Sequence, residues 1–83
     1  MSAPSPKPPL SDATGELGRR VKKRRHELGL SQEALAHDSD LHWSYLGQVE
    51  RGQVNPTLHN ILKISAVLGV DPADLIRGLK PAG

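Results

Sequence analysis

The sequence predicts an all-α fold, a compact bundle of five helices in one small domain. From residue 16 onward, apolar residues recur at the spacing of amphipathic helices. Serine, threonine or aspartate stands where several helices would begin, and glycine stands where several would end. A chain of 83 residues buries about 60% of the surface that its unfolded form exposes, so we expect one modest core.

The expected helices follow one another with short turns between them. They cover residues 16–28, 31–38, 42–50, 57–68 and 71–79. Ser31, Thr57 and Asp71 are each placed to accept a hydrogen bond from the first turn of a helix. Pro72 follows Asp71 at the first helical position, where a missing N–H costs little. Gly29 is placed to end the first helix in a left-handed cap.

Each expected helix has an apolar face that would pack into the core. The residues assigned to these faces are Leu17, Val21, Leu28, Leu35, Ala36, Leu41, Leu46, Leu58, Ile61, Leu62, Ile64, Leu68, Leu75, Ile76 and Leu79.

The first fifteen residues differ in composition from the rest. Four of the seven prolines stand in the first nine positions, among Ser, Ala and Lys. Because proline removes backbone donors and little here is apolar, we expect a disordered arm over residues 1–15 and the domain over 16–80. The start lacks the apolar segment of a signal peptide, no segment approaches a membrane span, and the chain has no cysteine. These features favour a cytoplasmic protein without disulfides.

Basic residues are concentrated in the first helix. The formal net charge is only +2, yet six of the eleven Lys and Arg residues lie within 19–25. Such a cluster creates a local positive field that favours an anionic partner such as nucleic acid. A solvated helix face is an equally good interpretation of the same cluster.

The motifs over residues 17–79 together resemble one known family. They are Gln32, Ala36, Leu41, Leu46, the run Glu50, Arg51, Gly52, and the run NPTL at 55–58. In this order they resemble the Cro/C1-type (Xre-like) helix-turn-helix family, which includes lambdoid phage repressors and the controller proteins of restriction-modification systems. The motif itself would span residues 31–52.

Two positions depart from the family pattern. The family usually has glycine where Asp40 stands, because the backbone there takes a positive φ. Aspartate tolerates this conformation, so we expect a positive φ at Asp40. His42 replaces the Ser or Thr that usually caps the third helix, and we expect this to weaken the helix start by up to about 1 kcal/mol.

The resemblance implies that the third helix enters the major groove of DNA with its first residues facing base edges. Trp43, Ser44 and Gln48 match the positions that read bases. Gln48 is suited to a bidentate contact with adenine, and Ser44 donates to or accepts from most base edges. Trp43 is expected to pack on thymine methyls or on the sugar-phosphate wall, with a protein contact as the alternative. Gly47 would let the backbone approach closely.

The resemblance also implies a set of residues around the third helix that bind phosphate. They are Gln32, Arg20, Tyr45, Arg51, Gln53, Asn55 and Thr57. Tyr45 is equally suited to packing on the core.

Two further features would complete the domain. The resemblance pairs Arg25 with Glu50, and we expect this ion pair to be partly buried and to lock the third helix to the body. It also implies a homodimer on a palindromic operator, with half-sites about 34 Å apart. The expected dimer seam consists of Val67, Val70, Leu75, Ile76 and Leu79.

The sequence therefore favours a regulator of transcription, of controller or repressor type, that binds double-stranded DNA at the nucleoid. The alternative is a protein-interaction module or antitoxin that keeps the fold, and a regulatory protein partner stays open. The histidines at 26, 37, 42 and 59 lack ligand-like spacing, and Ser31 is used as a cap. We expect no metal, no cofactor and no enzymatic activity.

Overall fold

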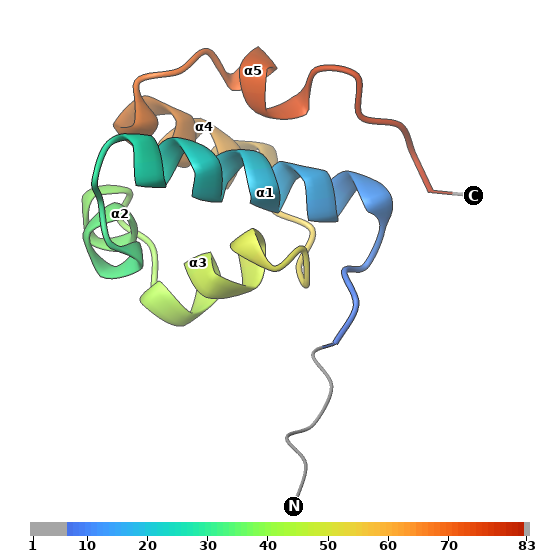
Figure 1. Cartoon of the computed structure of the whole chain (residues 1–83), viewed down its shortest axis with the longest axis horizontal. Helices are drawn as coiled ribbons and strands as arrows, with labels where there is room; N and C mark the ends of the chain where they lie inside the picture. The colour runs from blue at the N-terminus through green and yellow to red at the C-terminus, as the bar shows by residue number, and fades with distance from the viewer. Residues whose placement is uncertain (1–6, 83) are drawn as a thin grey trace, which may run out of the picture.

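The computed structural model describes residues 7–82, which form five helices and no strand. The helices are α1 (Asp12–Glu27), α2 (Gln32–Asp38), α3 (Trp43–Glu50), α4 (Leu58–Leu68) and α5 (Pro72–Ile76). α1 runs through the middle of the molecule and contacts α3, α4 and α5. In Figure 1, α3 and α5 lie on opposite sides of α1. The predicted all-α class and the number of helices are confirmed. No helix described here has the length and apolar character needed to span a bilayer.

α1 begins at Asp12 rather than at Glu16, so residues 12–15, which the sequence assigned to the arm, belong to the helix. Ser11 caps it, because its side chain accepts from the N–H of Thr14 while the Thr14 side chain accepts from the N–H of Ser11. This reciprocal pair is a capping box with threonine in place of the usual Glu or Gln. Of the rest of the predicted arm, residues 7–11 are described as the segment that leads into α1, and residues 1–6 lie outside the described residues.

The segment before α1 is tied to the end of α3. The N–H of Leu10 donates to the carbonyl oxygen of Gly52 at 2.8 Å, and the hydroxyl of Thr14 donates to the same oxygen at 2.9 Å. Gly52 has a φ of 72°, and a Cβ there would lie 2.7 Å from the Cα of Gly15. Glycine therefore meets two demands at this point, a left-handed backbone and a close approach of two segments.

The core draws residues from all five helices. Its fully buried apolar members are Leu17, Val21, Leu35, Ala36, Leu46, Val49, Ile64, Leu68 and Leu75, with Leu41, Ile61 and Leu79 packed at the edge. The predicted core residues Leu28, Leu58, Leu62 and Ile76 are instead exposed. Leu28 follows the last residue of α1 and Leu58 is the first residue of α4, so both lie at helix ends. Leu62 lies on the side of α4 away from the buried face that carries Ile64 and Leu68.

The turn between α2 and α3 has the predicted backbone. Asp40 has a φ of 56°, in the left-handed region that the family pattern required at this position. Asp40 is the single residue other than glycine with a positive φ among residues 7–82. The expectation that aspartate takes the place of glycine here is confirmed.

α1 comes against the backbone of α3 at Gly18. A Cβ at this position would lie 2.5 Å from the carbonyl oxygen of Val49 and 2.7 Å from the carbonyl carbon of Glu50. Both neighbours are backbone atoms of α3, so they cannot move aside as a flexible side chain would. The absence of a side chain at Gly18 allows the two helices to cross at this distance.

Candidate nucleic-acid interface

α3 has one buried side and one exposed side. Leu46, Val49 and Glu50 are buried against the rest of the domain. Trp43, with 60% of its surface exposed, and the exposed Ser44 and Gln48 lie on the outward side. Ser44 and Gln48 are one helical turn apart on this side, and Trp43 lies exposed at the start of the helix. We call these three residues the reading face, after their predicted role.

Glu50 anchors the end of α3 to α1 through a buried ion pair. Nε and Nη2 of Arg25 donate to the two carboxylate oxygens of Glu50 at 2.7 and 2.9 Å, and only 7% of each residue is exposed. These hydrogen bonds to Glu50 raise the pKa of the Arg25 guanidinium above its ordinary value. Nη1 of Arg25 also donates to the carbonyl of Leu30 at 2.9 Å. The predicted pair is present, and it is more fully buried than expected.

Gln32 joins this ion pair from the start of α2. Its Nε2 donates to Oε1 of Glu50 at 3.0 Å, and its side chain is half-buried. One N–H of the amide is thus used inside the protein, which leaves the second N–H for an outside acceptor. Glu50 thereby fixes α3, α1 and the head of α2 relative to one another.

His42 caps α3 in place of the usual Ser or Thr. Its Nδ1 accepts from the N–H of Ser44 at 3.2 Å and lies 2.7 Å from the Ser44 Oγ. The imidazole also stacks against the indole of Trp43, with ring centroids 5.9 Å apart and ring planes 26° from parallel. Histidine therefore supplies the acceptor that a serine cap would supply.

Arg51 and Gln53 follow α3 and lie beside its exposed side. Nε of Arg51 donates to Oε1 of Gln53 at 3.1 Å. The guanidinium of Arg51 covers Gly47, where a Cβ would lie 3.0 Å from Nη1. Gly47 is consequently buried, so the close backbone approach expected at this residue requires Arg51 to move.

The start of α4 borders the same surface. The side chain of Thr57 caps α4 by accepting from the N–H of Asn60, and Asn55 is exposed just before it. The hydroxyl of Tyr45 accepts from Nδ2 of Asn60 at 3.0 Å, and the Tyr45 ring packs against the core. Tyr45 therefore connects α3 to α4.

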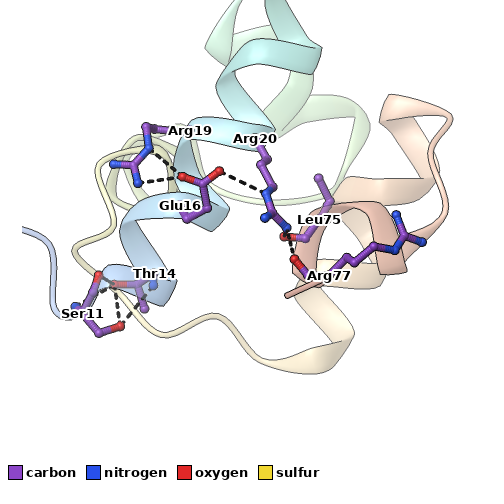
Figure 2. A network of polar contacts seen from close by, with 7 residues as sticks. All are labelled: Ser11, Thr14, Glu16, Arg19, Arg20, Leu75 and Arg77. Atoms are coloured by element: carbon purple, nitrogen blue, oxygen red, sulfur yellow. Dashed lines mark hydrogen bonds and ion pairs between the residues drawn. The ribbon is translucent and has the colours of Figure 1, made fainter. Parts of the chain in front are cut away.

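Arg20 lies apart from the other predicted phosphate ligands. Its Nη1 donates to the carbonyl oxygens of Leu75 and Arg77, at 3.2 and 2.8 Å, and so holds the end of α5 (Figure 2). The carboxylate of Glu16 accepts hydrogen bonds from Arg19 and Arg20. The bond from Arg19 makes the larger contribution and that from Arg20 the next in lowering the pKa of the Glu16 carboxyl. Arg20 is thus engaged with the end of α5, and α5 and α3 lie on opposite sides of α1 (Figure 1).

Most residues of the predicted dimer seam are buried or half-buried within the monomer. Leu75 is only 3% exposed and belongs to the core of the monomer, so it cannot present its side chain to a partner. Val67, Val70 and Leu79 are half-buried and pack against the same core. Ile76 is 43% exposed and is the one member that projects freely.

Two features that position the reading face were not predicted from the sequence. They are the contact of Gly18 with the backbone of α3 and the hydrogen bonds of Leu10 and Thr14 to Gly52. A glycine inside a helical pattern often has a packing reason, and this signal was present at Gly18. The hydrogen bonds to Gly52 join residues far apart in the sequence, so no local pattern could reveal them.

Comparisons with known proteins agree with this geometry. A family model described as helix-turn-helix matches residues 21–75. Control protein C.BamHI of Bacillus amyloliquefaciens is 47% identical over 61 residues, which cover 72% of this chain and 75% of that protein. The crystal structure of the restriction-modification controller protein C.AhdI from Aeromonas hydrophila is 47% identical, with a TM-score of 0.73 over 75% of this chain and 94% of that chain.

The regulator SinR is similar in two solved structures. In the crystal structure of SinR in complex with DNA, the matched chain is 40% identical to this chain. The TM-score is 0.68 over 71% of this chain and 95% of that chain. In the structure of the complex of SinR with SinI, the matched chain is 36% identical to this chain. The TM-score is 0.72 over 75% of this chain and 61% of that chain. The matched segment contains the turn at Asp40, the whole of α3 and the buried pair of Arg25 and Glu50. The chain belongs to the helix-turn-helix family.

Proposed function

We propose that this protein is a sequence-specific regulator of transcription that inserts α3 into the major groove of double-stranded DNA. The observation that carries the proposal is the reading face, where Trp43, Ser44 and Gln48 are accessible while the opposite side of α3 is fixed by the core. A helix held in this way presents side chains to base edges in a defined orientation. The similarity to controller proteins and to SinR bound to DNA supports the same function. Such a regulator would act at the nucleoid in the cytoplasm.

The residues around the reading face would hold the DNA backbone. Arg51, Gln53, Asn55, Thr57 and the free N–H of Gln32 border α3 and are of the types that bind phosphate. Tyr45 would reach phosphate only by turning its hydroxyl from Asn60. These contacts would set the register of the protein on DNA, and the reading face would supply the sequence preference.

A second copy of the chain would complete the operator contact. A single α3 reaches few base pairs, so useful specificity requires two subunits on a palindromic site, with half-sites about 34 Å apart. Exposed apolar side chains on α4 and α5, which are Leu58, Leu62 and Ile76, are the surface that a partner would cover. We place Ile76 at this seam in preference to Leu75.

Replacing Gln48 with alanine should blur the base preference of the protein. Selection of bound duplexes from a random pool at low salt should enrich an inverted repeat for the unaltered protein. Loss of a bidentate contact costs about 1–3 kcal/mol of discrimination, so the affinity of the Gln48→Ala variant for that repeat should fall at least about fivefold. Quantitative binding to the enriched site and to its single-base variants measures this.

The matched control for that experiment is Gln53→Ala. It removes the same kind of side chain beside the reading face, so it should weaken binding to all sequences while the base preferences persist. Failure to enrich any site would contradict the proposed function, and so would unchanged base preferences in the Gln48→Ala variant.

Replacing Ile76 with lysine should dissociate the homodimer. A charge without a partner in an apolar seam should raise the dimer dissociation constant at least about tenfold, as measured by sedimentation equilibrium. Leu28→Lys is the control, because Leu28 is exposed to nearly the same extent, 40% against 43%, but lies at the end of α1. Equal dimer constants for the two variants would place the seam elsewhere.

A regulatory protein partner is the second candidate, and the solved complex of SinR with SinI favours it. In this case a protein would bind the domain and change its affinity for DNA. Binding of such a partner would survive both Gln48→Ala and high salt, which distinguishes it from DNA.

A further inference from the structure

His42 and Ser44 make a short polar contact at the head of α3. Nδ1 of His42 is 3.2 Å from the backbone nitrogen of Ser44 and 2.7 Å from its Oγ. Both residues are exposed, so this contact lies on the surface that is proposed to meet base edges.

The contact with the backbone favours one tautomer of the imidazole. A backbone N–H can only donate, so the hydrogen bond of 3.2 Å from Ser44 is made when Nδ1 presents its lone pair. In the neutral ring the hydrogen then resides on Nε2. The indole of Trp43 stacks beside the ring, with centroids 5.9 Å apart, and supports this orientation.

The tautomer in turn fixes the hydroxyl of Ser44. Since Nδ1 carries no hydrogen, the contact of 2.7 Å to Oγ requires the Ser44 hydroxyl to donate, because two facing lone pairs would repel each other. The hydroxyl hydrogen is therefore used within the protein. What Ser44 presents to the outside is the acceptor capacity of Oγ.

We propose that His42 makes Ser44 an obligate hydrogen-bond acceptor, so that Ser44 selects an exocyclic amino group in the major groove. This inference rests on the proposed DNA-binding function. The donors available there are N6 of adenine and N4 of cytosine, whereas N7, O6 and O4 are acceptors that the constrained hydroxyl cannot satisfy. His42 is thus a positioning residue that sets a base preference through Ser44.

The tautomer can be tested without DNA. Nitrogen-15 NMR of the full chain, recorded above the titration range of imidazole, reports which ring nitrogen of His42 carries the hydrogen. We expect the hydrogen on Nε2 and an accepting Nδ1. A hydrogen on Nδ1 would overturn the proposal.

The base preference can be tested with a protein–DNA double-mutant cycle on the duplex selected from the random pool. Each adenine of a half-site is replaced in turn by purine, which lacks the N6 amino group. The loss of affinity is measured for the unaltered protein and for Ser44→Ala, and comparison of the two removes the effect of purine on the duplex itself. Cytosine N4 is tested in the same way with a base that lacks that amino group.

We expect one position at which loss of the amino group weakens the unaltered protein about five- to tenfold more than it weakens Ser44→Ala. The proposal would be overturned if Ser44 showed no coupling to any amino group, or if it were coupled to an acceptor atom of a base. In either case, enrichment of a site from the random pool would still support the proposed function. If no site is selected, function and inference fail together.

Two variants of similar shape separate the positioning role from a structural role. His42→Asn keeps an acceptor near the place of Nδ1, and His42→Leu has the same branching without an acceptor. We expect the asparagine variant to keep the coupling between Ser44 and the amino group, and the leucine variant to reduce it below about twofold. Full coupling in the leucine variant would show that His42 does not position Ser44.

Discussion

Replacing Glu50 with alanine should lower the free energy of unfolding by about 3–5 kcal/mol, since it leaves the buried guanidinium of Arg25 without its partner. The free energy of unfolding of a small domain is about 5–15 kcal/mol in total, so this loss would remove a large share of the stability of the protein. The variant also removes the acceptor for Gln32. Urea denaturation followed by circular dichroism measures the change.

Two variants test the cause of this loss. Glu16→Ala removes a carboxylate that also pairs with two arginines, but on an exposed surface, and should leave the urea midpoint nearly unchanged. The double variant Arg25→Met with Glu50→Leu removes both charges and should recover most of the stability. If Glu50→Ala were as stable as Glu16→Ala, the buried pair would not anchor α3.

Replacing Gly18 with alanine should destabilise the fold by about 3 kcal/mol or more, although alanine normally favours a helix by about 0.5–1 kcal/mol. The added Cβ would fall 2.5 Å from the carbonyl oxygen of Val49, and the only relief is a displacement of α3 from α1. Urea denaturation reports the stability. Because the reading face moves with α3, DNA affinity at temperatures below unfolding should also fall.

Gly47→Ala is the matched control, since Gly47 is likewise helical and buried. A Cβ there would meet the flexible end of Arg51, which can swing away, so the free energy of unfolding should stay within about 1 kcal/mol of the unaltered protein. Equal losses in the two variants would contradict a steric conflict between a Cβ at Gly18 and the backbone of α3.

Local rules predicted the parts of the fold that depend on neighbours in the sequence. The caps at Ser31, Thr57 and Asp71 are present as predicted, and so is the positive φ at Asp40, which the family resemblance implied. They follow from hydrogen bonds and backbone sterics within a few residues. The start of α1 was placed too late because its capping box uses Thr14, and because the residues before Leu17 offer little apolar periodicity.

Features that depend on distant packing were harder to predict. The sequence could not fix the rotation of the five-residue helix α5, so the inward Leu75 and the outward Ile76 were both assigned to the seam. The role of Arg20 depends on where α5 lies, which no residue of α1 encodes. For the candidate site, the resemblance identified the exposed side of α3, but the link between His42 and Ser44 required coordinates.

Leu10 and Thr14 both donate a hydrogen bond to the carbonyl oxygen of Gly52, so the beginning of the domain helps to hold the end of α3 in place. A tag or second domain joined upstream of Leu10 would pull on the loop that follows α3. One joined beyond Leu79 would load α5 instead, on the opposite side of α1 (Figure 1). Fusion at the two ends of this chain is therefore not equivalent, because an upstream fusion bears on the loop after α3 and a downstream fusion bears on the helix that carries Ile76 of the proposed dimer seam.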